Sequence, residues 1–158
     1  MRFFGYTALP AENIFAPYED DGKNRIYVDG PSVALSPGAA LTFATVLHEL
    51  ATNAIKYGSL STPRGGVKVA WRIANGVMPA TLRFRWQESG GPVIVVPDKR
   101  GFGTRLVEQG VRRELEGAAE IAFDPAGLQC RIEIPLTRRE DRSLGKMPRR
   151  PLWPPRFT

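Results

Sequence analysis

The sequence has one cysteine, one histidine and no long apolar run, and each shortage excludes a class of protein. Because Cys130 is alone, no disulfide can form within the chain, which fits the reducing cytosol. One cysteine and one histidine also cannot supply the ligands of an ordinary zinc site. No stretch approaches the ~20 apolar residues that cross a bilayer, and the first residues lack the apolar core of a signal peptide. We therefore expect a cytoplasmic protein with no membrane segment in this chain.

The net charge of +6 is concentrated near the C-terminus. Residues 137–158 hold seven of the 22 Lys and Arg but only two of the 16 acidic residues, together with four prolines. This composition predicts a basic, Pro-rich, disordered tail. Such a tail can contact an acidic protein, nucleic acid or anionic lipid. A solvated extension without a specific role is the simpler interpretation, and we expect no nucleic-acid partner.

Residues 47–57 (Leu-His-Glu-Leu-Ala-Thr-Asn-Ala-Ile-Lys-Tyr) form the most informative segment. At about 100° per residue, the helix has one apolar stripe: Phe43, Leu47, Leu50 and Ala54. A second stripe, roughly 110° round the helix, carries an acid, an amide and a base: Glu49, Asn53 and Lys56. A carboxylate can orient a water or accept its proton, an amide oxygen suits Mg²⁺, and a lysine can neutralise a phosphate. This segment alone fits a site for a polar ligand and a solvated helix face equally well.

Two glycine clusters follow this helix, at residues 86–92 (Trp-Gln-Glu-Ser-Gly-Gly-Pro) and 101–104 (Gly-Phe-Gly-Thr). Glycine lets a backbone approach a ligand closely. The second cluster directly precedes a predicted helix, whose free N–H groups and dipole favour a phosphate. Each cluster alone is weak evidence for a ligand site. Their order along the chain is specific evidence: a polar-faced helix, strands, an acid with glycines, a loop, then glycines with a helix.

Periodicity and turn residues predict six strands and two helices. The strands are expected at 25–29, 32–35, 67–74, 80–86, 118–123 and 128–135. The first helix should begin after Ser36 as N-cap, with Pro37 at its first position, and run to Tyr57 before Gly58. The second should span 104–116 and bury four residues: Leu106, Val107, Val111 and Leu115. We expect Cys130 to be a small buried residue within a strand.

Consecutive pairs of strands with helices between them favour an α+β fold. We expect a two-layer α/β sandwich with a mixed, mainly antiparallel sheet. The expected organisation is an irregular lead-in at 1–24, one domain at 25–136 and the tail at 137–158.

The ordered motifs resemble the ATP-binding catalytic domain of sensor histidine kinases, in the gyrase, heat-shock chaperone, histidine kinase and mismatch-repair ATPase superfamily. The HWE subfamily is the most similar, because it is named for a His in the first motif and a Trp-x-Glu in the second, here His48 and Trp86 to Glu88. Residues 48–61 resemble the N box, 88–92 the first glycine box and 101–103 the second. The resemblance covers roughly residues 12–136 and implies the Bergerat-type ATP-binding fold.

The resemblance implies roles for individual residues. Asn53 would ligate Mg²⁺ bridging the ATP phosphates, Glu49 would orient or activate the reacting groups, and Lys56 would meet phosphate. Glu88 stands where the superfamily usually has an Asp that accepts a hydrogen bond from the adenine amino group. Because its side chain has one more methylene, its backbone should lie slightly farther from the base. The nucleotide is further expected to contact Tyr57, Gly90, Gly91, Lys99, Arg100, Gly101, Phe102, Gly103 and Thr104.

Three aromatic or imidazole side chains have a less direct relation to the nucleotide. We expect Tyr57 to be half core and half pocket wall. Trp86 is expected to belong to the core rather than to stack on the cofactor. His48 lies about 100° from the polar stripe, so we expect a structural or supporting role and not that of phosphoacceptor.

The implied function is that of an ATP- and Mg²⁺-dependent protein histidine kinase of a bacterial two-component system. Its acceptor histidine would lie on a separate dimerisation domain, and its final partner would be the receiver domain of a response regulator. The chain would then be a fragment that binds nucleotide without phosphorylating itself. Three alternatives stay open: an anti-sigma-factor-type serine kinase, a degenerate binding module, and nucleic-acid binding through the tail. The stimulus, the response regulator and the oligomeric state are not encoded in these motifs.

Overall fold

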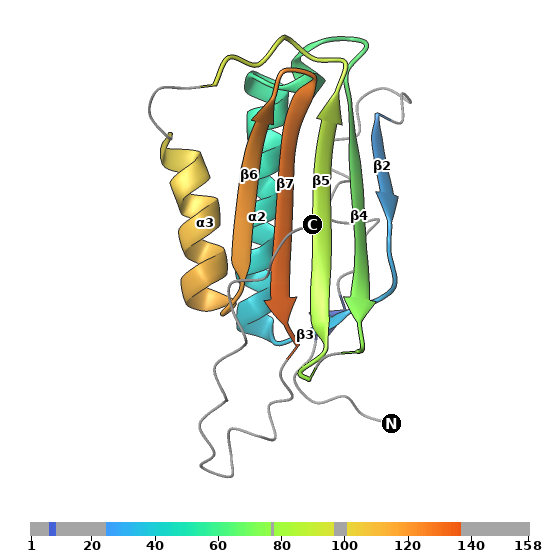
Figure 1. Cartoon of the computed structure of the whole chain (residues 1–158), viewed down its shortest axis with the longest axis vertical. Helices are drawn as coiled ribbons and strands as arrows, with labels where there is room; N and C mark the ends of the chain where they lie inside the picture. The colour runs from blue at the N-terminus through green and yellow to red at the C-terminus, as the bar shows by residue number, and fades with distance from the viewer. Residues whose placement is uncertain (1–6, 9–24, 77, 97–100, 137–158) are drawn as a thin grey trace.

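The computed structural model describes residues 7–8, 25–76, 78–96 and 101–136. Along the chain the elements are β1 (Thr7–Ala8), β2 (Ile26–Asp29), β3 (Ala34–Leu35), α2 (Pro37–Lys56), the 3-10 helix η2 (Ser59–Ser61), β4 (Gly66–Ala74), β5 (Thr81–Ser89), α3 (Phe102–Glu114), β6 (Ala118–Asp124) and β7 (Gly127–Pro135). Figure 1 shows the large sheet in front, with α2 behind it and α3 beside β6. The predicted α+β, two-layer arrangement is confirmed. The predicted tail and nearly all of the lead-in lie outside the described residues.

The main sheet has five strands in the order β2-β4-β5-β7-β6. Strand β2 runs parallel to β4, and the other three neighbouring pairs are antiparallel. The sheet is therefore mixed and mainly antiparallel, as predicted. A parallel neighbour cannot be reached by a tight hairpin, so the chain crosses from β2 to β4 through α2. The short strands β1 and β3 form a separate antiparallel pair.

Helix α2 begins and ends at the predicted signals. The hydroxyl of Ser36 accepts a hydrogen bond from the Ala39 N–H (3.3 Å), and Pro37 occupies the first helical turn. At the other end the N–H of Gly58 bonds to the carbonyl of Ala54 (3.1 Å), one residue beyond Tyr57 at the C-cap. All four residues of the predicted apolar stripe are buried: Phe43, Leu47, Leu50 and Ala54. This stripe packs the helix onto the inner face of the sheet.

Helix α3 begins two residues before the predicted start, so Gly103 lies inside it. Val107, Val111 and Leu115 are buried as expected. The prediction for Leu106 is wrong, since its side chain is 39% exposed. Leu106 precedes Val107 by one position, about 100° round the helix, and only one of the two can face α2 and the sheet.

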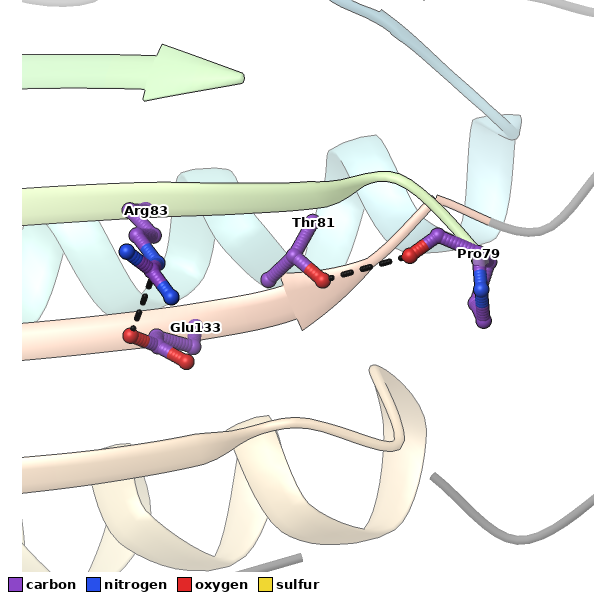
Figure 2. A network of polar contacts seen from close by, with 4 residues as sticks. All are labelled: Pro79, Thr81, Arg83 and Glu133. Atoms are coloured by element: carbon purple, nitrogen blue, oxygen red, sulfur yellow. Dashed lines mark hydrogen bonds and ion pairs between the residues drawn. The ribbon is translucent and has the colours of Figure 1, made fainter. Parts of the chain in front are cut away.

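The outer face of the sheet is charged because side chains alternate along each strand. On β5, Leu82 and Phe84 are buried, whereas Arg83 is exposed. Figure 2 shows Arg83 beside Glu133 of β7, with 3.2 Å between Nε and Oε1, and the Thr81 hydroxyl donating to the carbonyl of Pro79 (3.4 Å). A half-exposed pair of this kind contributes little to stability.

Candidate functional site

The motif residues meet at one end of the molecule, where α2 and β5 end and α3 begins (Figure 1). Two contacts join these elements. Glu88 of β5 bonds to Ser59, the first residue of η2, and Gly103 of α3 lies against Glu49 and Asn53 of α2. Segments far apart in the sequence therefore converge at this end of the molecule.

Glu88 is a buried carboxylate with a donor on each oxygen. It is 4% exposed and lies one residue before the end of β5, and this strand ends three residues later than predicted. Its Oε2 accepts from the Ser59 N–H (2.8 Å), and its Oε1 accepts from the indole N–H of Trp86 (3.1 Å). Burying a charged or polar group costs several kcal/mol unless it is hydrogen-bonded, so these two donors make the buried position tenable.

The first glycine box packs against the turn that follows α2. A Cβ at Gly91 would overlap the backbone of Ser59, so no larger residue fits there without a shift. Gly90 has φ +71°, the left-handed region that glycine adopts without strain. Its carbonyl accepts from the hydroxyl of Thr62 (2.9 Å). The chain after Glu88 is thus held close to the end of α2.

The second glycine box approaches the polar stripe of α2. A Cβ at Gly103 would overlap Oε1 of Glu49 and would lie 3.2 Å from Nδ2 of Asn53. Glu49 and Asn53 are one helical turn apart, so both side chains face the start of α3. The N box and the second glycine box therefore lie against each other in the described structure.

The first turn of α3 carries backbone N–H groups that its N-cap residue does not satisfy with a side chain. Its N-cap is Gly101, which offers no side-chain cap to the free N–H groups of that turn. Gly101 is exposed, and a Cβ there would meet nothing within 4 Å. Thr104 is half-buried in the same turn. Uncapped N–H groups and the positive end of the helix dipole suit a phosphate.

Not every predicted residue is gathered into this site. Tyr57 is 76% exposed, so the expectation that half of it belongs to the core is wrong; it is the C-cap of α2, where the chain leaves the helical path at φ −132°. Lys56 is exposed at the last position of the helix, and His48 is exposed on α2. Lys99 and Arg100 lie outside the described residues, as does the side chain of Phe102.

Ser59 and the indole of Trp86 are site residues that sequence reasoning missed. Trp86 is fully buried, as its assignment to the core required, and it also donates to Glu88. Ser59 is 2% exposed, and among the described residues its hydroxyl has no hydrogen-bond partner. The only signals were the one-residue gap of Trp-x-Glu, which puts both side chains on one face of a strand, and the position of Ser59 next to the N box.

Cys130 lies across from Trp86 in the β5–β7 pairing. Burial, together with the negative charges of Glu108 and Glu120, raises the pKa of its thiol from 9.0 to about 12, and burial is the largest of these causes. A thiol with this pKa is not a nucleophile at neutral pH. Its predicted place, buried within a strand, is confirmed.

The outer face of the sheet carries a separate hollow of about 600 Å³. Its lining comprises Asp29, Ala70, Trp71, Arg72, Arg83, Phe84, Arg85, Arg131, Ile132 and Glu133. None of these residues belongs to the N box or the glycine boxes. The site built by the motifs is therefore the convergence of α2, β5 and α3, and not this hollow.

No family model matches the chain. It is 34% identical over 122 residues to the blue-light-activated histidine kinase of Brucella ovis, and 36% identical over 126 residues to that of Brucella anthropi. These matches cover 77% and 80% of this chain, and they fall on the region that carries the motifs. The chain is a histidine kinase catalytic domain. It is related to the HWE-type, blue-light-activated kinases, which confirms the resemblance drawn from its motifs.

Solved structures agree on the fold of this histidine kinase domain. The histidine kinase domain of the Erythrobacter litoralis EL346 blue-light activated kinase superposes with a TM-score of 0.58 at 21% identity, covering 87% of this chain and 62% of that one. The catalytic domain of the histidine kinase ThkA gives 0.58 at 17% identity, covering 82% and 96%. The chain spans about a quarter of the length of its curated relatives, 25% and 26%. Within its described residues, no helix is both long and apolar enough to cross a membrane.

Proposed function

We propose that this domain binds ATP with Mg²⁺ and transfers the γ-phosphoryl group to a histidine on a separate dimerisation domain. The bond between the γ-phosphorus and its bridging oxygen breaks, a phosphorus–nitrogen bond forms on the imidazole, ADP leaves with the electron pair of the broken bond, and the imidazole releases one proton. The observation that carries the proposal is the convergence of three elements: the buried carboxylate of Glu88, the Glu49 and Asn53 side chains, and the uncapped start of α3.

The residues present fit a nucleotide and a divalent cation. Glu88 would accept from the base, Asn53 would ligate Mg²⁺, and the N–H groups after Gly101 would bind phosphate. Glu49 would orient the reacting groups and Lys56 would neutralise phosphate charge. Contacts are also proposed for Tyr57, Gly90, Gly91, Lys99, Arg100, Phe102, Gly103 and Thr104. In phosphoryl transfer, such positioning and charge neutralisation account for most of the catalysis.

The buried hydroxyl of Ser59 supports a ligand in this place. A hydroxyl without a partner is rare in a protein interior and points to a group that completes it, such as a water or a ligand atom. Ser59 also binds Glu88 through its N–H and underlies Gly91. The unpaired atom therefore lies within the cluster that the proposal assigns to the nucleotide.

The partners are proposed from the family and from the length of the relatives. Because the chain spans about a quarter of them, we propose that the phosphoacceptor and dimerisation domain belongs to the same kinase. The phosphoryl group would pass from it to the receiver domain of a response regulator. Residues 25–136 would form the catalytic domain, with 1–24 as lead-in and 137–158 as tail, and the site of action would be the cytoplasm.

The test is a calorimetric titration of ATP, with Mg²⁺ present and then chelated, into the wild type and Asn53→Ala. We expect binding in the micromolar-to-millimolar range, about 4–8 kcal/mol, weakened by chelation in the wild type. Asn53→Ala should bind more weakly and lose the dependence on Mg²⁺. Asn75→Ala is the matched control, since Asn75 is an exposed amide in the β4–β5 connection. Absence of binding at millimolar ATP would identify a degenerate module instead.

The acceptor is tested separately, with labelled ATP and the isolated dimerisation domain of a related kinase. Phosphohistidine is labile in acid, whereas phosphoserine is stable, so acid treatment distinguishes the two products. Acid-stable label on a partner would favour the serine-kinase alternative. Label on this chain alone would contradict the proposal that its acceptor lies elsewhere.

A further inference from the structure

Trp86 and Glu88 form a hydrogen-bonded pair that the spacing of Trp-x-Glu makes possible. Side chains two residues apart on a strand point to the same face, and both point into the protein from β5. The indole N–H of Trp86 donates to Oε1 of Glu88 (3.1 Å), with the two residues 0% and 4% exposed. The contact is therefore shielded from water, and a hydrogen bond to a carboxylate is strong in such a place.

The second oxygen of Glu88 is held from another element. The N–H of Ser59, after α2, donates to Oε2 (2.8 Å). One oxygen is thus tied to the sheet and the other to the turn that follows the helix, which fixes the plane of the carboxylate. Each carboxylate oxygen can accept more than one hydrogen bond, so Glu88 keeps acceptor capacity for a ligand.

A glutamate needs this restraint more than an aspartate would. A glutamate side chain has one more rotatable bond. Immobilising that bond on ligand binding costs conformational entropy, unless the folded protein already holds it fixed. Trp86 fills the core as a fully buried side chain, and its N–H adds a directed hydrogen bond to this packing. A buried indole N–H also requires an acceptor, and Glu88 supplies it.

We propose that Trp86 is a positioning residue for base recognition. Its indole N–H holds the Glu88 carboxylate in the orientation that accepts a hydrogen bond from the 6-amino group of a purine. The selected ligands are adenine nucleotides, against purine nucleotides that lack this amino group. The inference rests on the proposed function, since it concerns the base subsite of the same nucleotide pocket.

The experiment compares ATP with purine riboside 5′-triphosphate, which has hydrogen in place of the 6-amino group. Dissociation constants for both are measured by calorimetry on the wild type and on Trp86→Phe. We expect the wild type to prefer ATP by about tenfold or more, the equivalent of one hydrogen bond to a charged group. In Trp86→Phe the preference should fall to within about threefold, mainly through weaker binding of ATP.

Trp71→Phe is the matched control. The indole N–H of Trp71 donates to the carbonyl of Pro31 (2.7 Å), and Trp71 lines the hollow on the outer face of the sheet. Its loss removes an exposed indole hydrogen bond to a backbone carbonyl without touching Glu88. The ATP preference should be unchanged in this variant, which shows whether replacing any Trp of the sheet alters the preference.

Folding is controlled with a second variant at the same position. Replacing Trp86 by 3-benzothienylalanine substitutes sulfur for the N–H and preserves the size of the ring. It should lose the ATP preference just as Trp86→Phe does. Either variant retaining the full preference would overturn the inference, as would a wild type that binds both nucleotides equally. A wild type that binds neither nucleotide would refute the proposed function itself.

Discussion

The two glycines of the second glycine box should respond differently to the same substitution. At Gly103 a Cβ would overlap Oε1 of Glu49 and come within 3.2 Å of Nδ2 of Asn53, whereas at Gly101 it would meet nothing within 4 Å. Gly101 has φ −67° and ψ 167°, which alanine adopts freely. Gly103→Ala therefore perturbs the site, and Gly101→Ala is its matched control.

The size of the effect follows from the overlap. To restore van der Waals distance, the Glu49 carboxylate must move by about 1 Å, and a displacement of that size can cost about 100-fold in rate. The carboxylate is the end of a flexible, half-buried side chain, so it can move without disrupting the core. Alanine also favours a helix over glycine by up to about 1 kcal/mol. We expect Gly103→Ala to fold as stably as the wild type and to lose function.

The assay is single-turnover phosphoryl transfer to the dimerisation domain, with ATP affinity and thermal melting measured in parallel. Gly103→Ala should transfer about 100-fold more slowly at an unchanged or higher Tm, and Gly101→Ala should stay within about threefold of the wild type. Normal transfer by Gly103→Ala would refute the placement of Glu49 at the reacting groups. Equal losses in both variants would show that mobility of the glycine box matters, and not the contact with α2.

Three further predictions concern stability and reactivity. Glu88→Gln turns an NH₂ toward one of the two buried N–H donors. We expect it to lower the free energy of unfolding by about 1–3 kcal/mol, or the Tm by roughly 5–15 °C. A Tm equal to that of the wild type would contradict the hydrogen-bond assignment. Cys130 should resist iodoacetamide at pH 8 until the protein is unfolded. Because its pKa is raised from 9.0 to about 12 in the folded state, the free energy of unfolding should fall as the pH rises from about 9 to 12. In Cys130→Ala, measured by thermal melting over the same pH range, that fall should be smaller. Arg83→Ala should change the free energy of unfolding by less than about 1 kcal/mol, as measured by urea denaturation, and a larger loss would mean that the pair with Glu133 is not an ordinary surface contact.

Local signals in the sequence determined most of the fold. Ser36 and Pro37 start α2 because a hydroxyl cap and a fixed φ favour the first turn, and Gly58 ends it. Alternation predicted the strands of the main sheet, and the 3.6-residue period predicted the buried stripe of α2. These signals work because they act over a few neighbouring residues. The order of the motifs likewise predicted which family the chain resembles.

Exposure at the margins of the elements was less predictable. Leu106 has an apolar side chain, but its position on the helix turns it away from the core. Tyr57 lies at the C-cap of α2, where its side chain is exposed. In both cases composition favoured burial and geometry opposed it. Periodicity gives the angle between neighbouring side chains of a helix. Which of those side chains then faces the core depends on where the helix begins and ends and on how it packs.

Only the tertiary structure decided which atoms meet in the site. Ser59 and Glu88 are 29 residues apart, and no local pattern indicates that a backbone N–H after α2 binds a carboxylate on β5. The same holds for the difference between Gly101 and Gly103, which depends on the approach of α3 to α2. The sequence by itself determined the elements and the chemistry they carry, because both are local. The pairing of those elements depends on long-range packing, and it is this packing that makes Glu88 a restrained acceptor rather than a flexible side chain at the end of a strand.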